Sequence, residues 1–187
     1  MKFAAILILV FATAAFALDA GQKAAFFSLK STDGKQVKLS DYNGKNLVVI
    51  FVATRCPYSN AFNDTMAQLS RDYEAKGITV IGINSNTTES FAEVAKHTRD
   101  HFPFKVLKDE DSKIADQYHA QVTPEAFVID GTGTIRYHGA LGSSDNPTTD
   151  PSKANSTEIR AALDQLLAGQ DISKTKTKAF GCTIKRS

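Results

Sequence analysis

The sequence predicts an α/β domain in which a mixed central sheet is flanked by helices. Strand and helix patterns alternate along most of the chain, as in folds that cover a sheet with helices. Two apolar runs, at residues 47–53 and 78–83, are separated by a helical pattern, and such a crossover makes the two strands parallel. A later hairpin adds an antiparallel pair. The 187 residues suit a single domain with a sizeable core.

The first predicted elements lead to the centre of the sheet. Residues 26–30 and 36–39 are predicted to form a hairpin around the Asp33-Gly34 turn. A polar turn or short helix follows at residues 40–45. The run at residues 47–53 is short, β-branched and uncharged, which is typical of a buried strand.

The middle of the chain completes the crossover. A helix is predicted over residues 57–75, because apolar side chains recur at helical spacing until Gly77 ends it. A second buried strand follows at residues 78–83. The next helix is predicted over residues 88–100, with Thr88 as its N-cap.

The last third of the chain supplies shorter elements. A short edge strand is predicted at residues 104–107 and a short helix at 112–118. Residues 126–130 and 134–138 are predicted to form a hairpin. The final helix is predicted over residues 156–167.

Three segments lie outside these regular elements. Residues 1–17 combine the positive charge of Lys2, an apolar stretch and an Ala-x-Ala cleavage site, and are predicted to be a signal peptide. Residues 141–155 are predicted to be a long surface loop within a domain at 18–170. Residues 171–187 have little periodicity and are predicted to be an extended C-terminal tail.

A signal peptide implies export, to the periplasm or out of the cell. The apolar N-terminal stretch is shorter than the roughly 20 residues that span a membrane, so stable membrane insertion is not expected. An exported protein meets an oxidising environment in which a disulfide persists.

Composition and charge narrow the classes of ligand. The formal net charge of +2 and the absence of an arginine-rich or basic-aromatic stripe disfavour a nucleic-acid partner. No cofactor motif is found. His97, His101, His119 and His138 show no pairing with cysteine at metal-ligand spacing, so no metal is expected.

Cys56 lies where the central strand passes into the following helix. Pro57 suits the first turn of a helix, where its missing N–H is not needed. Backbone N–H groups and the helix dipole at such a position favour a thiolate over a thiol. The only other cysteine is Cys182, in the tail, and a Cys56–Cys182 disulfide is one of the outcomes open to the pair.

This order of elements, with a cysteine at the first crossover helix, resembles the thioredoxin fold. Residues Thr123-Pro124 precede the strand at 126–130, and the resemblance implies that Pro124 follows a cis peptide bond and packs beside Cys56. More narrowly, three motifs resemble a peroxiredoxin-like subgroup, the redoxin or AhpC/TSA-type proteins. These motifs are Cys56-Pro57-Tyr58, Ile83-Asn84-Ser85-Asn86 and Gly181-Cys182-Thr183-Ile184-Lys185.

The chain also departs from the motifs of the families that it resembles. Ser59 stands where dithiol oxidoreductases have a second cysteine. A peroxidatic Pro-x-x-x-Thr-x-x-Cys motif would need proline and threonine where this chain has Val49 and Ala53. There is no tryptophan.

The leading hypothesis is a thiol–disulfide oxidoreductase, an enzyme with protein or small-molecule disulfides or thiols as substrates. The Cys56 thiolate attacks a disulfide of the partner and forms a mixed disulfide with it. Arg55 lowers the pKa of the Cys56 thiol, and Ser59 donates a hydrogen bond to the Cys56 sulfur. Thr123 offers its backbone to the substrate. Either Cys182 or an external thiol then resolves the mixed disulfide.

Two alternatives stay open at this stage. In a peroxidase, Cys56 would become a sulfenic acid and condense with Cys182. In a non-enzymatic binding protein, a Cys56–Cys182 disulfide would tether the tail as a structural bond. Glu125 is expected to be a solvated turn carboxylate rather than a proton shuttle near Cys56.

Overall fold

The computed structural model describes residues 18–142 and 153–186. The predicted signal peptide at 1–17 and most of the predicted loop at 141–155 lie outside the described residues. Within the part that is described, no helix is long and apolar enough to cross a membrane.

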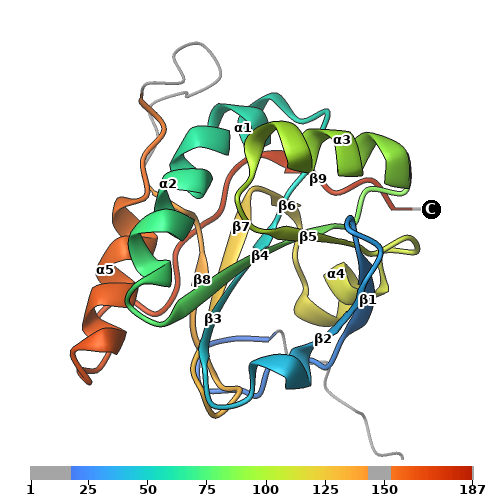
Figure 1. The fold of residues 1–187 in the computed structure, drawn as a ribbon. Coiled ribbons are helices and arrows are strands. Elements are labelled where there is room, and N and C mark those ends of the chain that lie inside the picture. Colours follow the sequence, from blue (N-terminus) through green and yellow to red (C-terminus); the bar gives the residue numbers. More distant parts are fainter. Residues whose placement is uncertain (1–17, 143–152, 187) are drawn as a thin grey trace, which may run out of the picture.

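A seven-stranded mixed sheet with the strand order β2-β1-β5-β4-β3-β7-β8 forms the centre of the fold (Figure 1). A second, two-stranded sheet joins β6 to β9. The strands are β1 (Ser28–Ser31), β2 (Gln36–Lys38), β3 (Asn46–Phe51), β4 (Ile78–Asn84), β5 (Lys105–Lys108), β6 (Val122–Thr123), β7 (Glu125–Ile129), β8 (Ile135–Gly139) and β9 (Cys182–Thr183). The helices are η1 (Leu39–Tyr42, a 3₁₀ turn), α1 (Pro57–Ala61), α2 (Asn63–Glu74), α3 (Phe91–His101), α4 (Lys113–Tyr118) and α5 (Thr157–Leu167).

The central strand β3 pairs in parallel with β4 and antiparallel with β7, as the crossover and the late hairpin predict. The predicted edge position of β5 is wrong, because β5 lies between β1 and β4. The N-terminal hairpin adds its strand β1 to β5 and so occupies this edge itself. Sequence pattern alone could not show that a short strand has partners on both sides.

Two predicted helices differ from the structure, one by a break within it and the other at its start. The helix predicted at 57–75 is interrupted at Phe62, whose backbone (φ −94°, ψ 1°) separates α1 from α2. The spacing of apolar side chains continues through this break and therefore does not reveal it. The next helix starts at Phe91, and its cap is Ser90 rather than Thr88. Ser90 and Glu93 form a reciprocal capping box that fixes this start.

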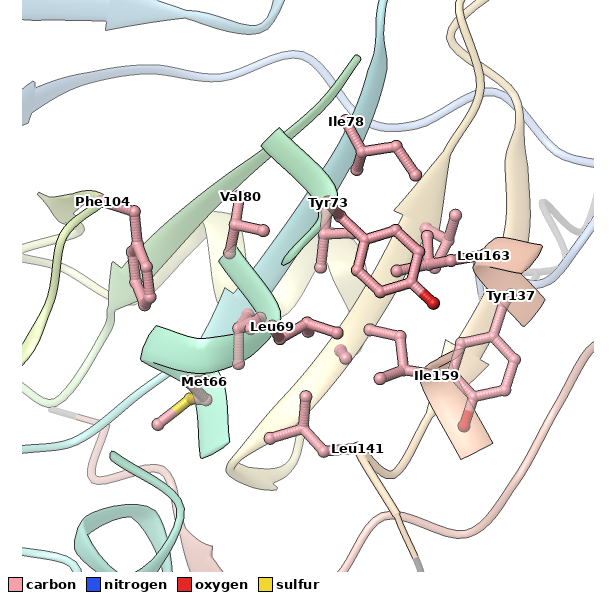
Figure 2. Close-up of a cluster of buried hydrophobic side chains, with 14 of the residues drawn as sticks. Met66, Leu69, Tyr73, Ile78, Val80, Phe104, Tyr137, Leu141, Ile159 and Leu163 are labelled. Carbon is pink, nitrogen blue, oxygen red and sulfur yellow. The ribbon is translucent and has the colours of Figure 1, made fainter. Parts of the chain in front are cut away.

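Hydrophobic side chains pack on both faces of the sheet. On one face, α2 and α5 bury residues such as Leu69, Tyr73 and Ile159 against β3, β4 and β7 (Figure 2). On the other face, α4 and the N-terminal hairpin cover a second cluster that includes Phe51 and Phe127. Leu141, which the sequence places in a surface loop, is buried in the first cluster.

The C-terminal tail packs along the domain from α5 to the region of α1 (Figure 1). Ile172 and Ile184 are buried. Between them, the backbone of Lys176 forms a parallel β-bridge with His138, and β9 pairs antiparallel with β6. The tail is therefore a packed part of the fold, and it reaches the carboxyl end of β3.

Candidate functional site

Cys56 is the N-cap residue of α1, and residues 52–55 separate it from the end of β3 at Phe51. Its backbone is extended, and Pro57 begins the helix, as the sequence predicts. The sulfur accepts a hydrogen bond from the backbone N–H of Ser59 at 3.3 Å. Cys56 is only 4% exposed, because the C-terminal tail covers it.

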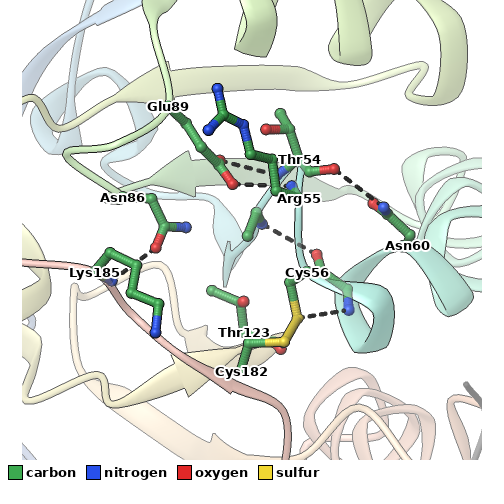
Figure 3. The surroundings of a disulfide bond; sticks show 11 residues. Thr54, Arg55, Cys56, Asn60, Asn86, Glu89, Thr123, Cys182 and Lys185 are labelled. Atoms are coloured by element: carbon green, nitrogen blue, oxygen red, sulfur yellow. Dashed lines mark hydrogen bonds between the residues drawn. A yellow bond between two sulfur atoms is a disulfide. The ribbon is translucent and has the colours of Figure 1, made fainter.

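Cys56 and Cys182 form a disulfide, with Cα atoms 5.8 Å apart and a separation of 126 positions in sequence (Figure 3). The bond lies beside Thr123, whose carbonyl oxygen is 3.3 Å from Cys56 Sγ. Thr123 is also the partner of Cys182 in the β6·β9 register. The Thr123–Pro124 peptide bond is cis, as the resemblance implies. The edge of Thr123 expected to receive substrate is thus occupied by the protein's own tail.

Ser59 and Arg55 take different positions from those expected. The Ser59 hydroxyl accepts a hydrogen bond from Ala53 N at 3.1 Å, so Ser59 reaches the sulfur through its backbone N–H. The Arg55 guanidinium points away from the disulfide (Figure 3) and donates to Glu93 Oε1. This interaction, together with hydrogen bonds from the backbone and side chain of Ser90, lowers the pKa of Glu93 to about 2.

Glu89 is a buried carboxylate that the sequence analysis did not single out. Its oxygens accept hydrogen bonds from Thr54 N and Arg55 N, each at 2.9 Å, and from Asn84 Nδ2 at 2.6 Å. These bonds fix the backbone of the two residues before Cys56. An acidic residue that precedes a helix gives no local signal of this long-range role.

A second set of polar contacts holds the tail after Cys182. Asn86 Oδ1 accepts from Lys185 N at 2.7 Å, and Thr87 N donates to Lys185 O at 2.9 Å. Lys108 is buried beneath them and donates to Asn86 O at 2.8 Å. Burial lowers the pKa of Lys108. The Asn84–Asn86 motif thus contacts the tail motif, and both belong to one site.

The expectation that Glu125 is solvated is wrong. Glu125 is 4% exposed and lies 2.6 Å from His138 Nε2. The alternation of strand β7 places this side chain inside, next to the cis proline. His138 is accordingly a partly buried residue that pairs with Glu125.

Two further histidines lie on α3. The rings of His97 and His101 lie 4.5 Å apart on α3, and burial lowers the pKa of His97. No group of three or more His, Cys, Asp or Glu side chains is arranged to hold a metal ion in the described residues.

The chain is similar in sequence to two kinds of known protein. ResA, a thiol-disulfide oxidoreductase of Bacillus subtilis, is 27% identical over 119 residues, which cover 63% of this chain and 65% of ResA. The chloroplastic peroxiredoxin Q of Triticum aestivum is 32% identical over 123 residues, which cover 59% of this chain and 54% of that protein.

Two solved structures show the same fold. A hypothetical protein of Sinorhizobium meliloti superposes with a TM-score of 0.83 at 28% identity, over 92% of this chain and 97% of that one. The thioredoxin domain of a thiol-disulfide oxidoreductase from Bacteroides vulgatus gives a TM-score of 0.60 at 20% identity, over 67% of this chain and 91% of that one.

The AhpC/TSA family model matches residues 20–138, which include Cys56, Thr123 and Pro124 but not Cys182. This range covers more than half of the chain. The protein therefore has a thioredoxin-like fold and belongs to the AhpC/TSA family.

Proposed function

We propose that the protein is a thiol–disulfide oxidoreductase in which Cys56 is the attacking thiol and Cys182 resolves the mixed disulfide. The observation that carries this proposal is the Cys56–Cys182 bond at the start of α1, beside the cis peptide bond at Pro124. The chain contains no third cysteine. Similarity to ResA supports the same class of reaction.

In the reducing direction, the Cys56 thiolate attacks one sulfur of a substrate disulfide. A bond forms between Cys56 Sγ and that sulfur, the substrate S–S bond breaks, and the other sulfur leaves as a thiolate with the electron pair. The Cys182 thiolate then attacks Cys56 Sγ and releases the second substrate thiol. An external dithiol returns two electrons to the Cys56–Cys182 bond, and the reverse sequence oxidises a substrate dithiol.

The surroundings of Cys56 favour its thiolate form. The Ser59 N–H that now points at the sulfur would donate to the thiolate, and hydrogen bonds to the charged form lower a pKa. Arg55 contributes chiefly through its backbone, which Glu89 holds in place. Thr123 and Pro124 form the face of the site that contacts either Cys182 or a substrate sulfur.

The substrates are proposed to be protein or small-molecule disulfides, or their thiols, met outside the cytoplasm. This location rests on the signal-peptide pattern of residues 1–17. The mature protein would then consist of a domain at residues 18–170 and a tail at 171–187 that carries the resolving cysteine.

The proposal is tested by mixing the reduced protein with glutathione disulfide and following the thiols by alkylation and mass spectrometry. The wild-type protein should return to the Cys56–Cys182 disulfide and release glutathione. Cys182→Ser should stop at a Cys56–glutathione mixed disulfide, whereas Cys56→Ser should not react. Unchanged turnover in Cys56→Ser would exclude the proposed mechanism.

Two measurements separate the alternatives. If the protein is a peroxidase, hydrogen peroxide would oxidise Cys56 much faster than glutathione disulfide does. The Cys182→Ser variant would then accumulate a sulfenic acid at Cys56. The midpoint potential of a structural disulfide would lie below about −300 mV, so the bond would resist reduction. The midpoint potential of a working pair would lie above about −300 mV.

A further inference from the structure

Glu125 directly follows the cis proline and is a buried carboxylate whose two oxygens both have close polar partners. Glu125 Oε2 accepts hydrogen bonds from Gln121 N at 2.7 Å and Val122 N at 3.2 Å. Glu125 Oε1 lies 2.6 Å from His138 Nε2. A buried carboxylate is costly unless such partners satisfy it. The reaction described above assigns no part to either Glu125 or His138.

His138 is held in a defined orientation on the neighbouring strand β8. Its ring stacks on Phe127, with centroids 4.2 Å apart and planes inclined by 11°. Its Nδ1 atom is 3.7 Å from Asp19 Oδ1, and this aspartate pairs with Lys176 Nζ at 2.6 Å. Glu125, Asp19 and Lys176 are thus the charged groups that surround the ring.

The same two residues connect two of the places at which the tail is attached. The backbone of His138 donates to Thr175 O and accepts from Thr177 N, each at 3.0 Å. The segment that Glu125 holds, Gln121–Val122, pairs with the tail after Cys182: Ile184 N donates to Gln121 O at 3.0 Å. The His138–Glu125 contact therefore links the tail before Cys182 to the strand that receives it.

We infer that Glu125 and His138 are positioning residues that hold the β6 edge and the tail so that Cys182 meets Cys56. The inference deepens the proposed function and rests on it only in that the Cys56–Cys182 couple is the one that turns over. Cys182 must be brought to a residue 126 positions away, and preorganised groups meet at a much higher effective concentration than free ones.

Removal of the Glu125 carboxylate leaves Gln121 N, Val122 N and the His138 ring without their buried partner. Unsatisfied buried donors favour a rearranged backbone. A rearranged β6 no longer presents Cys182 to Cys56, so the disulfide becomes easier to reduce. The predicted change lies in the equilibrium of the disulfide, a quantity that a general loss of stability elsewhere in the domain does not alter.

The test measures the equilibrium constant for formation of the Cys56–Cys182 disulfide in dithiothreitol buffers, and the free thiols are counted by alkylation. Glu125→Ala should lower this constant at least about tenfold, which corresponds to about 30 mV for a two-electron couple. Glu125→Gln should largely restore it, because an amide oxygen can accept both N–H groups while its nitrogen donates to His138. If Glu125→Ala does not fold, His138→Phe keeps the stacked ring, loses the contact to Glu125, and should shift the constant in the same direction.

Asp130 provides the matched control at the other end of β7. Its carboxylate accepts from Thr132 N at 2.9 Å and Thr134 N at 3.1 Å and pairs with Arg136, far along the strand from the cysteines. Asp130→Ala should lower thermal stability without a shift in the disulfide constant.

Three results would overturn the inference: an unchanged constant in Glu125→Ala, an equal shift in Asp130→Ala, or a shift in Glu125→Gln as large as in Glu125→Ala. The proposed function is judged separately, by reaction with glutathione disulfide. A wild-type protein that fails to react, while Glu125→Ala still shifts the constant, refutes the function alone.

Discussion

The residue before Cys182 offers a sharp test of how the tail docks. Gly181 adopts φ +155°, a region that side chains with a Cβ rarely occupy. A Cβ atom at this position would collide with the backbone carbonyl of Thr123, which cannot move without disturbing β6. Gly181→Ala therefore places strain specifically in the docked tail.

The magnitude follows from the cost of such a backbone conformation. A residue with a side chain that is held in this region costs the folded protein about 1–3 kcal/mol of free energy. Reduction of the disulfide lets residue 181 relax, so the strain acts on the oxidised state. The disulfide constant should then fall roughly 5- to 150-fold, because about 1.4 kcal/mol is a factor of ten. The midpoint potential should rise by roughly 20–65 mV, since about 30 mV corresponds to 1.4 kcal/mol.

The assay is a redox titration in glutathione or dithiothreitol buffers, with the Cys56 and Cys182 thiols counted after alkylation. Gly169→Ala is the matched control. Gly169 ends α5 at φ +67° with open space around it, so its substitution strains the backbone without touching the cysteines. A potential in Gly181→Ala equal to that of the wild type, or an equal shift in Gly169→Ala, would refute this account of the docked tail.

Three further predictions concern neighbouring contacts. Ile184→Ala removes a buried side chain of the tail and should lower the free energy of unfolding of the oxidised protein by about 2–5 kcal/mol, measured by urea denaturation; a change near zero would show that the tail is only loosely packed. Glu89→Ala leaves two backbone donors before Cys56 unsatisfied and should cost about 1–3 kcal/mol in the same assay, with slower reaction of Cys56; an unchanged free energy and rate would contradict its role. In Arg55→Gln, the pKa of Glu93 should rise from about 2 toward its ordinary value of 4.5, as followed by NMR titration of the Glu93 carboxyl; a pKa that stays near 2 would assign the shift to Ser90 instead.

The sign of the pH effect at Glu93 follows from its lowered pKa. A carboxyl whose pKa is depressed in the folded state contributes stability above its ordinary value of 4.5, and this contribution disappears as pH falls toward about 2. The wild-type protein should therefore lose more stability than Arg55→Gln over this acid range. Because both side chains are exposed, salt should reduce the difference.

Local patterns were sufficient for most of the secondary structure. The Asp33-Gly34 turn, the apolar run of β3 and the late hairpin each have a short-range signal, and each forms where predicted. The errors lie where the structure depends on contacts between segments that are distant in the sequence, or where the local pattern does not change. The break at Phe62 leaves the apolar spacing intact, and the interior place of β5 depends on the N-terminal hairpin.

The sequence by itself determined that Cys56 lies at a strand-to-helix junction, because an apolar run, a cysteine and a proline are adjacent in the chain. The thioredoxin-like resemblance added the cis bond at Pro124. Only the tertiary structure decided that Cys182 covers Cys56, that Glu125 is buried against His138, and that the Arg55 side chain turns to Glu93. Each of these depends on partners that packing brings together from distant parts of the chain, and a local pattern carries no information about such partners.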